Sequence, residues 1–393
     1  MLILEEPYIS RELAEFAARS GEAVLDNASA REAEKNFNVS FSLLDDAAFA
    51  ERCSRGERCS RGERLYTNSE NALDWLYTYS KNQELIAQVE RLKDKVSMRR
   101  ALAPLYPDYS FRELTLEEVL ALDANDLVLP CVLKPSVGFC SLGVYCIENE
   151  GQWQHAKDDI AANVADWCRQ YPAAVLGDNK WIVESLIQGT EYAVDVYFDD
   201  AGRAVVCNIL RHDFASAQDV SDRLYYTSVG IIREMLAPLE EWFNTVNNYL
   251  GLRNFPTHVE LRCDDGGRIV PIEFNPLRFA GLSCTDISLF AWGFATYKCF
   301  LDNTRPDWKF ILQDREDDRV YTLMVLNKPE NCPVVTSFDY DAMCRLFRKV
   351  VCLRKGFYDK YSHFGILFTE TLRSDWKELT DFATNDLTEF INK

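Results

Sequence analysis

The sequence predicts an α/β (α+β) protein with more than one lobe, and three observations lead to this prediction. The chain has 393 residues, 47% of them hydrophobic and 12% aromatic, which is more than one hydrophobic core usually serves. Its N-terminal part alternates short apolar segments with a segment of helical spacing. Its middle part contains apolar segments joined by glycine-containing turns. We therefore expect a small α/β lobe followed by a larger part rich in hairpins.

The N-terminal lobe, residues 1–93, is predicted from short elements of different period. Residues 2–4 and 23–25 are apolar enough for strands, and residues 10–18 between them have the spacing of a helix. Residues 82–103 form a charged helical segment that leads out of this lobe.

The elements expected after this lobe follow from apolar runs and turn residues. A tail of α+β character begins at about residue 305. In order along the chain, we expect two strands around a loop with Gly138 and Gly143, a helix over 153–170, a strand ending at Glu184, a hairpin turning at 201–202, a helix over 238–250, a hairpin over 255–276, strands over 320–325 and 364–368, and a final helix.

Charge excludes several classes of partner. The formal net charge of -19 comes from 62 acidic and 43 basic residues. A field of this sign repels phosphate backbones and anionic membrane surfaces, so we expect no nucleic-acid and no membrane partner. The N-terminus lacks a basic flank followed by an apolar core, and no apolar run approaches the roughly 18 residues of a membrane span. We therefore expect a cytoplasmic protein.

The thirteen cysteines lack the paired spacing of a zinc site, and we expect them to be reduced. Two of them, Cys53 and Cys59, fall in the hexapeptide ERCSRG, which occurs twice in tandem in residues 51–62. We interpret the repeat as a duplicated stretch in a surface loop or at a helix end. A metal or redox role for these two cysteines is the alternative.

The hairpin over residues 255–276 carries the strongest chemical signal. Strand alternation places His258 and Glu260 on one face of the first strand, and Glu273 and Asn275 on one face of the second. A two-residue turn at Gly266-Gly267 sets Glu260 opposite Glu273 and His258 opposite Asn275, and a turn at Asp265-Gly266 keeps both carboxylates on the same face. Because facing like charges destabilise a ladder, a cation is expected between them, and Mg²⁺ prefers such oxygen ligands. A solvated face whose charges happen to align is the alternative.

Lys134 and a glycine-containing loop form a second candidate site. Lys134 ends an apolar strand, and Ser136, Gly138, Ser141 and Gly143 follow it. Glycines let a backbone close over phosphates, and the lysine supplies a positive charge. An ordinary hairpin turn is the alternative.

The remaining candidates flank these two sites. Lys95 lies in the helical segment before Lys134, where a solvated surface lysine is the alternative. Glu184 ends a strand and Glu191 begins the next one. Backbone groups at such a strand end can bind an adenine edge, and a nearby carboxylate can accept ribose hydroxyls. Two surface acids are the alternative.

In order, these segments resemble the ATP-grasp superfamily, in the carboxylate-amine ligase branch that includes L-amino acid ligases, D-alanine-D-alanine ligase and biotin carboxylase relatives. The interval of thirteen residues from Glu260 to Glu273, followed by Asn275, is the most specific element. The matching motifs are DK at 94–95, LKPSVGFCSLGV at 133–144, VES and GTE within 183–191, HVE at 258–260 and EFNP at 273–276.

The resemblance implies an ATP-grasp fold with ATP and Mg²⁺ as cofactors. Residues 1–93 would be the pre-ATP-grasp lobe, residues 94–304 the ATP-grasp domain with a lid subdomain at about 125–188, and residues 305–393 an α+β extension. Lys95 and Lys134 would hold the ATP phosphates, Ser136, Gly138, Ser141 and Gly143 would belong to the lid loop, Glu184, Ser185, Leu186 and Ile187 would pair with adenine, Glu191 would bind the ribose, and Glu260, Glu273 and Asn275 would coordinate one or two Mg²⁺ ions, with Mn²⁺ as a substitute.

The sequence departs from the family in its candidate catalytic cation. Many relatives have arginine directly after the Asn-Pro pair, whereas Leu277 stands here and Arg278 follows. D-alanine-D-alanine ligases have arginine two positions before the first metal acid, where this chain has His258. We expect Arg278 to stabilise the transition-state oxyanion, and His258, Arg262 or a purely structural role for Arg278 are the alternatives.

The expected activity is the ATP-dependent joining of a small-molecule carboxylate to an amine through an acyl phosphate, with ADP and phosphate as products. The alternatives are a carboxy-phosphate-forming enzyme and a nucleotide-binding regulatory subunit without turnover. The resemblance also allows a homodimer.

Overall fold

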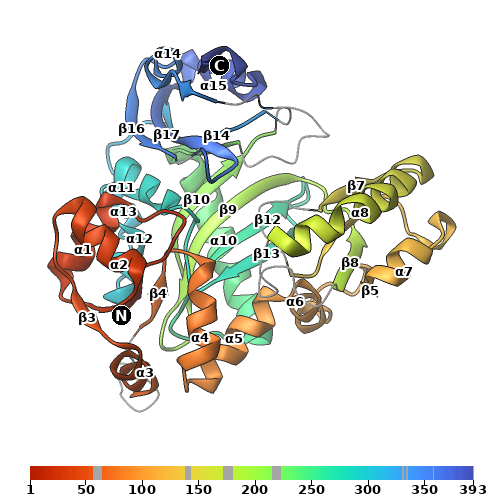
Figure 1. Cartoon of the computed structure of the whole chain (residues 1–393), viewed down its shortest axis with the longest axis horizontal. Coiled ribbons are helices and arrows are strands. Elements are labelled where there is room, and N and C mark those ends of the chain that lie inside the picture. The colour runs from red at the N-terminus through yellow and green to blue at the C-terminus, as the bar shows by residue number, and fades with distance from the viewer. Residues whose placement is uncertain are drawn as a thin grey trace.

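The computed structural model describes residues 1–55, 64–137, 143–170, 180–214, 223–329, 332, 335–356 and 358–392. Figure 1 shows the N-terminal lobe on the left of the long central sheet and a lid sheet on its right, while the C-terminal strands of the central sheet lie at the top. Among the described helices, none is long and apolar enough to cross a membrane.

The N-terminal lobe is built on a parallel sheet in the order β3-β2-β1-β4. Its first helix begins where the side chain of Ser10 accepts the N–H of Leu13, which confirms a helix at this place. Cys53 is buried, and residues 56–63, which include Cys59, lie outside the described residues. The elements are β1 (Leu2–Ile3), α1 (Arg11–Ser20), β2 (Ala23–Leu25), α2 (Ala28–Phe37), β3 (Ser42–Leu44), α3 (Asp46–Arg55), β4 (Tyr66–Thr67) and α4 (Leu73–Tyr79).

The long helical segment predicted after this lobe is two helices, α5 (Gln83–Lys93) and α6 (Lys95–Leu102). Asp94 separates them, because its carboxylate accepts backbone N–H groups from the first turn of α6. Lys95 and Arg99 lie one turn apart on α6, and both are buried. One face of this short helix therefore carries two cations into the interior.

The lid sheet is antiparallel, in the order β5-β8-β6-β7. Two helices, α7 (Leu116–Ala121) and α8 (Glu150–Gln170), pack against it through an apolar cluster that includes Trp153 and Ile160. The two strands predicted around the Lys134 loop are thereby confirmed. The strands are β5 (Phe111–Thr115), β6 (Cys131–Pro135), β7 (Tyr145–Ile147) and β8 (Lys180–Ser185).

The central sheet has eight antiparallel strands in the order β13-β12-β9-β10-β11-β14-β17-β16. The strands of the C-terminal tail continue the sheet that begins with the hairpin β12–β13, and the domain boundary at residue 304 stays a prediction. The strands are β9 (Thr190–Phe198), β10 (Ala204–His212), β11 (Leu224–Thr227), β12 (Phe255–Cys263), β13 (Ile269–Pro276), β14 (Arg319–Asn327), β16 (Val350–Lys355) and β17 (His363–Leu372).

One face of the central sheet is covered by α10 (Val229–Leu250), whose apolar side packs on Val194 and Val196 of β9. The helix was expected to begin at Pro238, and that prediction is wrong. It begins after Ser228, whose hydroxyl accepts the N–H of Ile231, and Pro238 lies inside it. Because side chains alternate along a strand, the neighbours of Val194 on β9 face the opposite side, where the candidate site lies.

A buried arginine of β16 joins the C-terminal strands to the rest of the chain. Arg354 pairs with Asp286 at 2.6 Å and with Glu12 of α1 at 3.0 Å, and it donates to the carbonyl of Ser283 at 2.8 Å. Its guanidinium also lies 5.6 Å from the ring centre of Tyr8. Contacts to the N-terminal lobe and to the segment after β13 therefore meet at one side chain.

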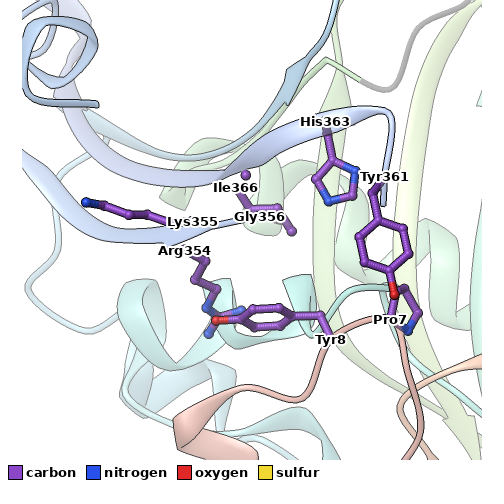
Figure 2. Close-up of a pocket in the computed structure, with 9 residues that line it drawn as sticks. Pro7, Tyr8, Arg354, Lys355, Gly356, Tyr361, His363 and Ile366 are labelled. Atoms are coloured by element: carbon purple, nitrogen blue, oxygen red, sulfur yellow. The ribbon is translucent and has the colours of Figure 1, made fainter. Parts of the chain in front are cut away.

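A small hollow lies beside Arg354. Figure 2 shows Tyr8 and Arg354 on one side of it, with His363 and Tyr361 on the other. The remaining elements are α11 (Ile287–Trp292), α12 (Thr296–Leu301), α13 (Trp308–Ile311), β15 (Ser337–Phe338), α14 (Tyr340–Cys344), α15 (Lys377–Thr384) and β18 (Ile391–Asn392).

Candidate active site

The hairpin β12–β13 has the predicted pairing where its charged residues lie. Glu260 pairs with Glu273 and His258 with Asn275, so the facing carboxylates are confirmed. Beyond them the register shifts, because Leu261 pairs with Pro271 and leaves Ile272 as an extra residue. This is a β-bulge, next to the candidate metal residue Glu273.

Both predicted turns of this hairpin are wrong. The backbone N–H of Asp264 bonds to the carbonyl of Arg268 at 3.1 Å, which leaves three residues in the loop instead of two. Gly267 takes the left-handed conformation at φ +80°, and the side chain of Asp264 accepts N–H groups of Gly266 and Arg268. The bulge at Ile272 offsets the extra loop residue, which is why the pairing of the carboxylates is still the predicted one.

The candidate site is organised as rows across the face of the sheet opposite α10. Cross-strand partners share a face, so strand register places their side chains side by side. We name each row after its residue on β12. The His258 row contains Asn275, His258 and Asp195, the Glu260 row contains Glu273, Glu260 and Ala193, and the Arg262 row contains Arg262, Glu191 and His212.

In the Glu260 row, Lys95 reaches the sheet from the first turn of α6. Its ammonium group lies 2.8 Å from Oε2 of Glu273, and the amide of Asn275 donates to Oε1 of the same carboxylate at 3.2 Å. Burial alone would raise the pKa of Glu273, but the adjacent charge of Lys95 holds that pKa well below its usual range. Glu273 is therefore ionised at neutral pH and lies beside a second carboxylate, that of Glu260.

The carboxylates of the Glu260 row, together with Asn275 of the His258 row, fit a hard divalent cation. Two carboxylates and an amide oxygen are oxygen ligands of the kind that Mg²⁺ takes together with phosphate oxygens. Within the part of the chain that the structure describes, no three His, Cys, Asp or Glu side chains are grouped for a metal ion. Asn275 and oxygens of a bound ligand would thus have to complete the coordination of Glu260 and Glu273.

A second charged cluster lies under the lid sheet. Glu184, at the end of β8, accepts from Lys134 at 2.8 Å and from Nε of Arg99 at 2.6 Å. Burial opposes ionisation of Glu184, yet these two cations lower its pKa to about 2. Burial also lowers the pKa of Lys134, although Glu184 partly counteracts this effect.

Arg99 was not predicted as a site residue. Besides Glu184, it binds the carbonyl of Pro271 at 2.6 Å, next to the bulge of β13. It therefore connects the lid sheet to the hairpin. Its spacing of one helical turn from Lys95 is a sequence signal that could have revealed it.

The loop after Lys134 is described only at its two ends. The carbonyl of Ser136 accepts the N–H of Lys95 at 3.0 Å, and the hydroxyl of Ser136 bonds to Asp94. Gly143 has φ +69°, a conformation that favours glycine. Gly138 and Ser141 lie outside the described residues. Lys95 and Lys134 are thus brought together by the end of β6, as their predicted common role requires.

The predicted adenine segment follows Glu184. The carbonyl of Ser185 accepts the hydroxyl of Tyr109 at 2.9 Å, and the N–H of Leu186 donates to Pro130 at 3.3 Å. The carbonyl of Ile187 accepts Nη1 of Arg262 at 2.7 Å. Part of the hydrogen-bonding capacity of this segment is therefore used within the protein.

Glu191, the predicted ribose ligand, lies in the Arg262 row. Its Oε2 accepts Nε of Arg262 at 3.0 Å, and its Oε1 lies 2.9 Å from Nδ1 of His212. Burial alone would raise the pKa of Glu191, but His212 and Arg262 lower it. The carboxylate is held in one orientation from both sides.

In the His258 row, a buried aspartate orients the histidine. Oδ1 of Asp195 lies 2.7 Å from Nδ1 of His258 and also accepts the N–H of Ala280 at 2.9 Å. Oδ2 accepts the hydroxyl of Thr285 at 2.6 Å. Asp195 was missed by the sequence analysis, although an acid among the apolar residues of YAVDVYF is an unusual pattern for a buried strand.

Arg278 lies in the segment after β13 and pairs with Glu70 of the N-terminal lobe at 2.9 Å. Glu70 also pairs with Lys93. Three residues of this segment, Leu277, Leu282 and Ser283, have φ near +55° to +59°, a strained conformation for residues with a side chain. The structural salt bridge considered for Arg278 is present, and a catalytic role stays a prediction.

The described geometry can be compared with known proteins. Residues 127–286 match the family model of the ATP-grasp domain, whereas no curated protein matches the chain in sequence. The L-amino acid ligase from Bacillus licheniformis superposes with a TM-score of 0.66 at 17% identity, covering 100% of this chain and 97% of the other. The N5-carboxyaminoimidazole synthase from Aspergillus clavatus has a TM-score of 0.61 at 14% identity, covering 99% and 98%.

Biotin carboxylase from Campylobacter jejuni is also similar, with a TM-score of 0.60 at 12% identity, covering 94% of this chain and 87% of the other. At these identities the likeness concerns the fold. The chain thus contains an ATP-grasp domain and has the mixed α/β ATP-grasp fold that its motifs predicted. L-amino acid ligase and biotin carboxylase are among its structural neighbours.

Proposed function

We propose that the protein is an ATP- and Mg²⁺-dependent ligase that activates a substrate carboxylate as an acyl phosphate and transfers the acyl group to an amine. Amino acids or small peptides are the proposed substrates, and ADP and phosphate are the products. The observation that carries the proposal is the Glu260 row, where two carboxylates face each other beside the ammonium group of Lys95. The proposal includes one or two Mg²⁺ ions, Mn²⁺ as a substitute and a cytoplasmic location.

The residues of the site suit phosphoryl transfer, which depends on positioning and charge neutralisation. Lys95 and Lys134 supply cations for the phosphate oxygens. Bound Mg²⁺ would supply further positive charge, held by Glu260, Glu273 and Asn275. No residue of the protein needs to form a covalent intermediate.

The nucleoside end of the site is formed by the segment Glu184–Ile187 and by Glu191. Glu184 is fixed by Arg99 and Lys134, which sets the position of the strand end that would bind adenine. Glu191 is fixed by its own neighbours and would accept the ribose hydroxyls. Glu191 lies on the same face of the central sheet as Glu260 and Glu273, and the segment Glu184–Ile187 leads from β8 of the lid sheet into β9, an arrangement that suits a single bound nucleotide.

The substrate end is assigned to Arg278 and His258. Arg278 would neutralise the carboxylate or the oxyanion that forms from it, since a guanidinium matches carboxylate geometry. His258 is oriented by Asp195 and lies in the row next to Glu260 and Glu273. The pairing of Arg278 with Glu70 requires that the substrate share or displace this contact.

A second candidate is an enzyme that forms carboxy-phosphate from bicarbonate. Its support is the similar fold of biotin carboxylase and of N5-carboxyaminoimidazole synthase, with TM-scores of 0.60 and 0.61. The two candidates share the ATP site and differ only in the carboxylate that is phosphorylated.

The experiment that tests the proposal is a measurement of ADP and phosphate released from ATP and Mg²⁺ in the presence of amino-acid pools. Release that requires both a carboxylate and an amine supports the ligase. Release that requires bicarbonate instead supports the second candidate. Binding of ATP without release in any pool would contradict both and favour a regulatory subunit.

A further inference from the structure

Arg262 lies two residues after Glu260 on the same face of β12. Its Nε donates to Glu191 at 3.0 Å, and its Nη1 donates to the carbonyl of Ile187 at 2.7 Å. The side chain is 25% exposed, so it borders the open face of the site. One guanidinium is therefore fixed to both parts of the chain that are assigned to the nucleoside.

The position of Arg262 argues against the oxyanion role that the sequence left open for it. Strand residues rise about 3.3 Å each, so Arg262 lies roughly 7 Å along β12 from Glu260 and roughly 13 Å from His258. The phosphate-transfer chemistry is assigned to the Glu260 row and the substrate to the His258 row. Arg262 is thus on the far side of the metal residues from the reacting carboxylate.

The chemistry of an arginine suits the nucleoside end. The guanidinium is planar, carries five N–H donors and stacks on aromatic rings, whereas a lysine ammonium does none of this. Its contacts to Glu191 and Ile187 engage Nε and Nη1, and its guanidinium carbon lies 5.8 Å from the ring centre of Phe214. A purine placed against the other face of the guanidinium would meet a cation whose orientation is already determined.

We propose that Arg262 is a specificity-determining residue for the nucleoside of ATP: it holds Glu191 for the ribose hydroxyls and offers its guanidinium face to the base. This inference rests on the proposed function, since it presupposes that ATP binds at these rows. It assigns Arg262 no contact with the phosphates.

The test compares binding of ATP with binding of tripolyphosphate, which has the phosphates and no nucleoside. Both are titrated with Mg²⁺ by calorimetry into the wild type, Arg262→Leu and the control Arg268→Leu. Arg268 lies on the same hairpin, but it is exposed and pairs with Asp108 at 2.6 Å. We expect Arg262→Leu to weaken ATP binding roughly ten- to thirtyfold and to leave tripolyphosphate binding unchanged. Arg268→Leu should change neither.

An equal loss for both ligands would overturn the inference, because it would place Arg262 at the phosphates. Unchanged ATP binding by Arg262→Leu would overturn it as well. Arg262→Lys keeps the charge without the planar fork, so we expect it to bind ATP nearly as weakly as Arg262→Leu, and full binding by Arg262→Lys would reduce the role to charge alone and contradict the proposal. A wild type that binds tripolyphosphate and ATP equally would overturn nucleoside recognition, and one that binds neither would overturn the proposed function itself.

Discussion

Two glutamates of the site, Glu184 under the lid sheet and Glu273 on the hairpin, differ in how their charge is neutralised. Glu184 lies between two cations, Arg99 and Lys134, and 2% of its side chain is exposed. Glu273 pairs with Lys95, faces the carboxylate of Glu260, and is 24% exposed. The first arrangement is closed and fixes the strand end. The second retains negative charge next to solvent, where a divalent cation can enter.

The largest effect is expected from Glu184→Gln, which leaves Arg99 and Lys134 buried without their counter-ion. Breaking a buried ion pair in this way costs about 3–5 kcal/mol of the free energy of unfolding. Urea unfolding measures it, with the exposed Glu148 as the control, since Glu148→Gln should change stability by less than about 0.5 kcal/mol. A Glu184→Gln protein as stable as the wild type would show that the pairing of Glu184 with Arg99 and Lys134 does not stabilise the fold.

Glu273→Gln should instead act on turnover. Loss of a metal ligand at the phosphates is expected to lower the rate of ADP release by about 10²–10³-fold. Its effect on unfolding should be smaller than that of Glu184→Gln, because Glu273 is partly exposed and its removal relieves repulsion with Glu260. Circular dichroism checks that the fold is kept. An active Glu273→Gln enzyme would refute the metal assignment.

At acidic pH, the contribution of Glu184 to the free energy of unfolding should be lost. Its pKa is lowered from 4.5 to about 2, so its stabilisation is complete above about pH 4.5 and is lost as the pH falls towards 2. The stability difference between the wild type and Glu184→Gln, measured by urea unfolding from pH 6 to pH 2.5, should therefore shrink by about 2.5 kcal/mol. A difference that stays constant over this range would mean that folding does not shift the pKa of Glu184.

The smallest effects are expected from alanine substitutions of two glycines. One lies in the hairpin loop and the other follows the adenine segment. Gly267 in the hairpin loop has φ +80° with open space around it, so Gly267→Ala should cost about 1 kcal/mol from backbone strain alone. Gly189, between the adenine segment and Glu191, has φ +113°, and a Cβ there would lie 2.3 Å from the carbonyl oxygen of Cys263. Gly189→Ala should cost about 2–3 kcal/mol and also weaken ATP binding. Thermal unfolding ranks the two, and an equal cost would show that the adenine segment is not tightly packed.

Features of the hairpin that depend on the alternation of side chains along a strand were predicted correctly from the sequence. The faces of β12 and β13 and the pairing of Glu260 with Glu273 follow from the two-residue period of strands. The three-residue loop and the bulge at Ile272 did not follow, because they depend on the left-handed backbone of Gly267 and on hydrogen bonds to Asp264. The extra loop residue and the bulge residue each shift the strand register by one residue, and the two shifts cancel at Glu260 and Glu273.

Partners that are distant in sequence were not predictable in the same way. Arg99 meets Glu184 across 85 residues, and Arg278 meets Glu70 across 208. Such pairs leave no periodic signal, since only the folded chain brings α6, the lid sheet and the N-terminal lobe together. The early start of α10 was missed for a local reason, because Pro238 is tolerated inside the helix.

Arg354 ties the C-terminal strands to the segment that carries Arg278. Protein synthesis starts at the N-terminus, so the residues assigned to ATP leave the ribosome before Arg354 does. Until it arrives, Ser283 and Asp286 lack the guanidinium that ties them to α1. For these contacts, the segment that carries Arg278 therefore depends on a residue that is synthesised late.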